Sequence, residues 1–183
     1  GAATLTVCRR PRVALFSTGD ELVMPGTVAP DDLPPGAIYN SNRFTLRGLL
    51  QAAGCEVQDL GIVPDRLGAT RAALRHAAQS NDLILTSGGV SVGEEDHIRP
   101  AVAAEGRVDL WQVAMKPGKP LAFGALPRPD GREALFMGLP GNPVSSFVTF
   151  LLAVAPVLRT LQGADPSLPA PLALRADFDL ARP

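Results

Sequence analysis

The feature that most constrains the fold is an alternation between short apolar runs and longer segments expected to be helical. Residues 12–17, 55–63 and 82–86 are runs of strand length, and the first and third have the apolar character of strands buried on both faces. The segments expected to be helical are residues 40–53, 70–79 and 96–105. Strands that alternate with single helices form βαβ units. The sequence therefore predicts an α/β fold, a Rossmann-like three-layer arrangement with a mostly parallel sheet and helices on both faces.

The second half of the chain adds three predicted strands, at residues 108–114, 121–126 and 134–137, and a long apolar helix at 143–161. Asn40 or Ser41 can cap the start of the first helix, and Gly54 can end it. Thr70 is the predicted N-cap of the second helix. Residues 24–36 hold four prolines and two glycines and are expected to be irregular.

The chain is expected to divide into three parts. Residues 1–10 read as the tail of a preceding domain, and residues 11–162 as the α/β domain. Residues 163–183 read as a linker followed by the first strand of a β-domain, because residues 172–179 alternate apolar with polar side chains. We therefore expect the sequence to be a piece of a longer protein.

Composition excludes several classes of function. The 17 Lys and Arg residues against 18 Asp and Glu residues give a net charge of −1, so nonspecific binding to nucleic acid or to a membrane is not expected. Cys8 and Cys55 are the only cysteines, which argues against a disulfide framework and a cysteine zinc site. The longest apolar stretch, residues 147–158, is interrupted by Pro156, so we expect it to be too short to span a bilayer. We expect a cytoplasmic protein.

In an open parallel sheet, ligands bind beyond the carboxyl ends of the strands, so the loops after the strands are the places to search. The loop after the first strand carries Asp20 and Glu21. Two adjacent carboxylates can hold a hard cation or orient a water molecule. The alternative is that Asp20 caps a turn and Glu21 is solvated.

The loop after the third strand, residues 87–93, has three glycines within six residues. Glycines allow backbone N–H groups to turn inward, and a helix follows, so the loop can hold a phosphate. Ser87 and Ser91 add hydroxyl donors, and Asp96 could coordinate a magnesium ion that bridges phosphate oxygens. The alternative is a tight turn in which Asp96 is an N-cap.

Two further turns could bind anions. Lys116 and Lys119 flank a Pro-Gly turn that holds their charges close together, which suggests an oxyanion site rather than a solvated basic turn. In residues 138–145, Gly141 permits close backbone approach, Asn142 can cap the following helix and Ser145 can donate to an anion. The alternative for this second turn is simply a well-capped helix.

Taken together, these segments resemble one known family. The segments that carry the resemblance occur in a fixed order: residues 17–22, 40–41, Asp65, and residues 87–96, 116–120 and 138–145. They look like the molybdopterin molybdenumtransferase family, called MoeA in bacteria and the E domain of gephyrin in animals. The resemblance covers residues 5–180.

The resemblance implies the last step of molybdenum cofactor synthesis. In that step, adenylylated molybdopterin and molybdate give molybdenum cofactor and AMP, with a divalent metal, usually Mg²⁺. It assigns catalytic roles to Glu21, Asp65 and Asp96, and places Glu21 and Asp96 at the metal. It associates Lys116 and Lys119 with molybdate, near Pro120 and Ser145. The remaining substrate-binding positions that it implies are Ser87, Gly88, Gly89, Ser91, Gly141 and Asn142.

The resemblance also implies partners and rival functions. Members of the family act as homodimers, and the molybdopterin adenylyltransferase is a candidate partner. Full-length members carry earlier domains and a complete C-terminal β-domain, which contributes to the molybdate site. One alternative is the adenylyltransferase activity on the same fold, against which the paired-lysine turn and the strand after Leu172 argue. A gephyrin-like scaffold is the other, although the sequence offers no exposed aromatic groove.

Overall fold

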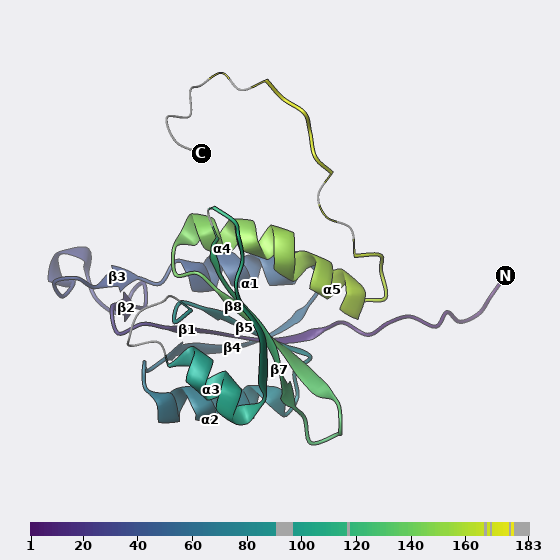
Figure 1. The fold of residues 1–183 in the computed structure, drawn as a ribbon, viewed down its shortest axis with the longest axis horizontal. Helices are drawn as coiled ribbons and strands as arrows, with labels where there is room; N and C mark the ends of the chain where they lie inside the picture. The colour runs from purple at the N-terminus through teal and green to yellow at the C-terminus, as the bar shows by residue number, and fades with distance from the viewer. Residues whose placement is uncertain (91–96, 117, 167, 169, 176, 178–183) are drawn as a thin grey trace.

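The computed structural model describes residues 1–90, 97–116, 118–166, 168, 170–175 and 177. Within these residues a six-stranded sheet has the order β4-β1-β5-β8-β7-β6, with helices on both faces (Figure 1). Strands β4 (Glu56–Val63), β1 (Arg12–Thr18), β5 (Leu83–Ser87) and β8 (Glu133–Leu139) are parallel. Strand β7 (Pro120–Pro127) runs antiparallel to β8 and to the edge strand β6 (Arg107–Gln112). The predicted three-layer α/β class is confirmed.

Two layers of helices bury the two faces of this sheet (Figure 1). One face is covered by α1 (Asn42–Ala52) and by a continuous helical segment made of α4 (Pro143–Thr149), the π-helical turn η2 (Phe150–Val154) and α5 (Ala155–Leu161). The other face is covered by α2 (Leu67–Ala78) and α3 (Ile98–Glu105). Alternation along β1 sends Val13 and Leu15 into the first core and Ala14 and Phe16 into the second.

The predicted caps of the first helix are present, whereas the predicted N-cap of the second helix is not. In α1, the Asn40 side-chain oxygen accepts a hydrogen bond of 3.1 Å from the Arg43 N–H, and Gly54 follows the helix with a φ of +79°. The prediction for α2 was wrong, because the helix begins at Leu67 and Thr70 lies fully buried inside it. The Thr70 N–H donates to the Arg66 carbonyl, so the helical turn is already formed at that residue.

The proline-rich segment at residues 24–36 is irregular, as predicted, apart from the short helix η1 (Pro30–Asp32). It is flanked by two-residue strands that pair in parallel, β2 (Leu22–Val23) and β3 (Ile38–Tyr39). The Tyr39 hydroxyl donates a hydrogen bond of 2.7 Å to the Val28 carbonyl, which links β3 to the irregular segment. Strands this short leave no periodic signal in the sequence.

Two expectations about the C-terminal part need correction. The segment Pro143–Leu161 has the length and apolar composition to cross a bilayer, whereas the sequence suggested an interruption at Pro156. The π-helical turn lies just before Pro156, and the helix continues beyond it while Phe150, Val154 and Leu158 pack into the core. In addition, residues 172–175 of the predicted strand at 172–179 are not in a strand, and the described part of the chain pairs no strand with them.

Candidate functional site

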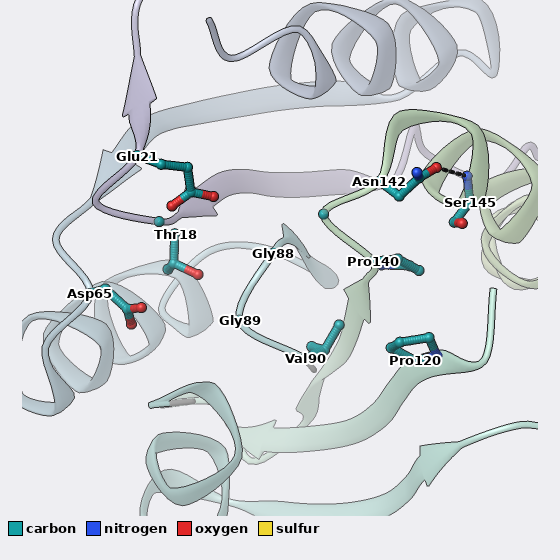
Figure 2. Close-up of a pocket in the computed structure, with 12 residues that line it drawn as sticks. Thr18, Glu21, Asp65, Gly88, Gly89, Val90, Pro120, Pro140, Asn142 and Ser145 are labelled. Carbon is teal, nitrogen blue, oxygen red and sulfur yellow. Dashed lines mark hydrogen bonds between the residues drawn. The ribbon is translucent and has the colours of Figure 1, made fainter. Parts of the chain in front are cut away.

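A cavity of about 420 Å³ lies beyond the carboxyl ends of the parallel strands (Figure 2). Its walls come from the ends of β1, β4, β5 and β8 and from the start of β7. The residues that line it are Thr18, Gly19, Glu21, Asp65, Gly88, Gly89, Val90, Pro120, Pro140, Gly141, Asn142 and Ser145. This volume is typical of a site for a small organic ligand, and the location at this edge of the sheet was predicted.

The loop after β1 places a carboxylate at the cavity. Gly19 has a φ of +147°, and a Cβ at this position would lie 2.5 Å from Oε2 of Glu21. The absence of a side chain at Gly19 therefore lets the Glu21 carboxylate fold back over the loop. Asp65, which follows β4, contributes a second carboxylate to the lining, whereas the exposed Asp20 does not.

The loop after β5 brings backbone close to the end of β1. Gly88 and Gly89 have φ values of +85° and +65°, which favour glycine. A Cβ on Gly88 would lie 2.5 Å from the carbonyl oxygen of Thr18, and one on Gly89 would lie 2.6 Å from the Thr18 hydroxyl oxygen. The Gly88 N–H donates to the Leu139 carbonyl at 3.1 Å. The paired-glycine turn is thus packed against both neighbouring strands.

The loop after β8 is held by two asparagines. The side-chain oxygen of Asn142 accepts a hydrogen bond of 3.0 Å from the Ser145 N–H, and Pro143 occupies the first turn of α4. This confirms Asn142 as the predicted cap. The side-chain amide of Asn42 donates to the Gly141 carbonyl at 2.8 Å and holds the loop from the side of α1.

Several predicted site residues are not brought into the cavity. Ser87 is buried, and its hydroxyl oxygen lies 2.9 Å from that of Ser17. Strand alternation places the Ser87 side chain on the face toward α1, so the prediction of a ligand contact through its hydroxyl finds no support here. Lys116 and Lys119 are exposed and are not among the lining residues, although Pro120 beside them is. The predicted residues Ser91 and Asp96 lie outside the described residues.

Among the described residues, the lining offers two carboxylates, Glu21 and Asp65, and no Lys or Arg side chain. Among the described residues, no group of three or more His, Cys, Asp or Glu side chains could hold a metal by itself. Mg²⁺ is commonly bound by one or two carboxylates together with substrate phosphates. The described residues therefore fit a magnesium ion that is held jointly with a phosphate ligand.

Several lining residues were not predicted individually from the sequence. Thr18 is the last residue of β1 and lies on the same strand face as Phe16, so period-two alternation could have indicated that its side chain is buried. Val90, another lining residue, is only 1% exposed. It fits there because β8 has a glycine at Gly138, where a Cβ would lie 2.5 Å from Cγ1 of Val90. Contacts of this kind between separate loops leave no local sequence signal.

Comparison with known proteins shows which family the chain belongs to. Residues 14–160 match the family described as "Probable molybdopterin binding domain", and the chain belongs to this family. The chain is 46% identical over 163 residues to a molybdopterin molybdenumtransferase of Haemophilus influenzae, and covers 38% of that relative. It is 42% identical over 158 residues to a molybdopterin molybdenumtransferase of Nostoc, of which it covers 35%. These matches include 89% and 86% of the chain.

A solved structure supports the same fold. The molybdopterin biosynthesis MoeA protein of Pyrococcus horikoshii superimposes with a TM-score of 0.71 at 32% identity. The match covers 85% of this chain and 36% of that one. The predicted family resemblance is therefore confirmed, and the chain spans little more than a third of the length of these relatives.

Proposed function

We propose that this chain is the pterin-nucleotide-binding part of a molybdopterin molybdenumtransferase. The whole protein would insert molybdenum from molybdate into adenylylated molybdopterin and release AMP in the last step of molybdenum cofactor synthesis. The observation that carries the proposal is the cavity itself, where a paired-glycine turn and two carboxylates meet in a molybdopterin-binding fold. A ligand with a pyrophosphate group and an aromatic ring system suits this combination of backbone, carboxylates and apolar walls.

The pterin nucleotide would lie along the turns after β5 and β8. Gly88, Gly89 and Gly141 present backbone that a ligand can approach closely, because they carry no side chain. Asn142 and Ser145 add polar groups at the start of α4. Ser91 is retained in the proposal as a hydroxyl donor from the same loop as Gly88.

Glu21 and Asp65 would hold Mg²⁺ together with the ligand's phosphate oxygens, and Asp96 is proposed as a further ligand. When bound, the ion would offset negative charge on the phosphoanhydride as it is cleaved. The chain's own contribution is to fix the two carboxylates, Glu21 through the turn at Gly19 and Asp65 through the end of β4. All three residues are proposed as catalytic positions.

Lys116 and Lys119 would bind the molybdate dianion at the rim of the site. Two observations support this role: Pro120, next to Lys119, lines the cavity, and the Val113 N–H donates to the Lys119 carbonyl at 3.0 Å. Gly118 lies between the lysines with a φ of +115°, and a Cβ at this position would lie 2.6 Å from Cε of Met115 and 2.7 Å from Cγ2 of Thr149. Gly118 therefore lies close to α4, to which Thr149 belongs.

The remaining proposals concern the whole protein. We propose a cytoplasmic homodimer, served by a molybdopterin adenylyltransferase, with further domains that complete the molybdate site. Residues 1–10 would belong to the end of one such domain, and residues 163–183 to a linker and the start of another.

Calorimetry of the 183-residue chain with adenylylated molybdopterin, with and without Mg²⁺, tests the proposal. We expect binding that is strengthened by Mg²⁺ in the wild-type chain. Glu21→Gln and Asp65→Asn should each reduce this strengthening, because each removes a carboxylate from the cavity. Asp20→Asn is the matched control, since Asp20 is exposed beside Glu21 and does not line the cavity.

Two results would contradict the proposal. One is the absence of binding to adenylylated molybdopterin under any metal condition. The other is formation of adenylylated molybdopterin from ATP and free molybdopterin, which would favour the adenylyltransferase alternative instead.

A further inference from the structure

Thr18 carries a buried hydroxyl that has no hydrogen-bond partner among the described residues. The residue is 2% exposed at the end of β1, and its hydroxyl oxygen is among the buried polar atoms left unpaired. A buried hydroxyl without a partner is costly, and such groups in folded proteins call for an explanation. Ligand binding is one such explanation when the group faces a cavity.

Thr18 does face the cavity. It is one of the lining residues, and Figure 2 shows its hydroxyl directed toward the turn at Gly88 and Gly89. The turn accommodates it closely, because a Cβ on Gly89 would lie 2.6 Å from this oxygen. The hydroxyl is thus held where the ligand's phosphate group would meet the glycine backbone.

The neighbouring groups define what the hydroxyl can bind. Ionised Glu21 and Asp65 can only accept hydrogen bonds, whereas a threonine hydroxyl can donate one. We infer that Thr18 positions the nucleotide ligand by donating a hydrogen bond from its hydroxyl to a phosphoryl oxygen. This inference rests on the proposed function, since it assumes a phosphate-containing ligand in the cavity.

A second threonine provides a matched control. Thr86 lies on β5, opposite Phe16 of the adjacent strand β1. Phe16 in turn lies two residues before Thr18. It is fully buried, and its hydroxyl is also unpaired among the described residues, but it does not line the cavity. Thr18→Val and Thr86→Val therefore make the same chemical change in neighbouring strands, and only the first alters the cavity wall.

The experiment is calorimetric titration of the chain with ADP and Mg²⁺, together with thermal unfolding of each variant. ADP carries the adenosine and pyrophosphate parts of adenylylated molybdopterin. Thr18→Val should weaken ADP binding by about 10- to 100-fold, the effect of losing one hydrogen bond to a charged group. Thr18→Ser, which keeps the hydroxyl, should stay within about threefold of wild type, and Thr86→Val should bind as wild type does.

Thermal unfolding separates a ligand role from a structural one. Because the Thr18 hydroxyl has no partner in the described part of the fold, Thr18→Val should unfold at the same temperature as wild type or higher. A lower unfolding temperature, or unchanged ADP affinity in a wild-type-like fold, would overturn the inference and leave the proposed function standing. If the wild-type chain bound neither ADP nor adenylylated molybdopterin, the proposed function would fail and the inference with it.

Discussion

The side-chain amide of Asn42 donates a hydrogen bond of 2.8 Å to the carbonyl oxygen of Gly141, which joins the first turn of α1 to the loop after β8. These residues are 99 positions apart in the sequence. Asn42 is 8% exposed, whereas Gly141 is exposed at the cavity. The helix on one face of the sheet therefore fixes the position of a loop that lines the site.

Asn42→Ala should loosen this loop without unfolding the chain. Losing one hydrogen bond should lower the free energy of unfolding by about 1 kcal/mol, because water can reach the Gly141 carbonyl. We expect ADP affinity to fall several-fold, since the turn that lines the cavity is no longer held. Ser41→Ala is the control, because Ser41 is exposed and makes no capping hydrogen bond. If Asn42→Ala and Ser41→Ala had the same ADP affinity and the same free energy of unfolding, the Asn42 hydrogen bond would not be holding the loop at the cavity.

Gly88→Ala should be far more destabilising than an alanine at another glycine of positive φ. Its Cβ would lie 2.5 Å from the Thr18 carbonyl oxygen, a backbone atom that can move only with β1. The matched control is Gly131→Ala in the β7–β8 hairpin, where φ is +78° but no atom lies within 4 Å. We expect a loss of about 1 kcal/mol for Gly131→Ala and more than about 2 kcal/mol for Gly88→Ala.

Chemical denaturation of both variants measures this difference. If Gly88→Ala and Gly131→Ala lowered the free energy of unfolding by similar amounts, the fold would not require the close approach of Gly88 to the Thr18 carbonyl. ADP titration of the Gly88→Ala variant at a temperature where it stays folded then reports how far the turn supports ligand binding.

The sheet could be predicted from sequence more reliably than the site. Strand β1 was predicted at residues 12–17 and β5 at residues 82–86, each within one residue of the observed bounds. Both are buried on two faces, so burial alone fixes their composition. The start of α2 was predicted wrongly, because Thr70 has the chemistry of a cap but lies at a position where the helix is already formed.

The site required information that no local pattern carries. Sequence reasoning predicted Glu21, Gly88, Gly89, Asn142 and Ser145 at the site, because turns that follow strands gather at one edge of a parallel sheet, and all five line the cavity. Asp65 also lines the cavity, but only the family resemblance had pointed to it. The sequence alone could not show that the Ser87 side chain faces Ser17 whereas the Thr18 side chain faces the cavity. These directions depend on which face of the sheet each strand residue points to, and on how the strands pair. The position of the lysine turn relative to the cavity likewise depends on tertiary packing.

Asp82 should make the stability of the chain depend on acid pH. Its carboxylate accepts hydrogen bonds from the Arg9 guanidinium, from the Arg12 N–H at 2.8 Å and from Arg128 at 3.0 Å. Burial opposes ionisation of Asp82, but the Arg9 and Arg12 hydrogen bonds outweigh it and lower the pKa below its ordinary value of 3.8. A carboxyl with a lower pKa in the folded state stabilises the fold above its ordinary pKa, and this stabilisation is lost as pH falls through the folded value.

Asp82→Asn should therefore lower the free energy of unfolding at neutral pH by about 1–3 kcal/mol and flatten its decline below about pH 4. Denaturant titrations between pH 2 and 7 measure both effects. Asp130→Asn is the comparison: the Arg132 hydrogen bond lowers the Asp130 pKa to about 2, but this ion pair is exposed and screened by solvent. If Asp82→Asn and Asp130→Asn changed the pH dependence of the unfolding free energy equally, the partly buried Asp82 carboxylate would have no special role in acid stability.

The two cysteines should differ sharply in reactivity toward an alkylating reagent. Cys55 is 8% exposed, and burial raises the pKa of its thiol to about 11, whereas Cys8 is exposed. Only the thiolate reacts, so the buried thiol is protected both by its protonation and by its packing. At pH 8, iodoacetamide should modify one thiol in the folded chain and two after unfolding in guanidinium, with mass spectrometry assigning the first to Cys8. In a Cys8→Ser variant the folded chain should remain unmodified, and rapid modification of that variant would show that the core around Cys55 opens far more readily than its packing indicates.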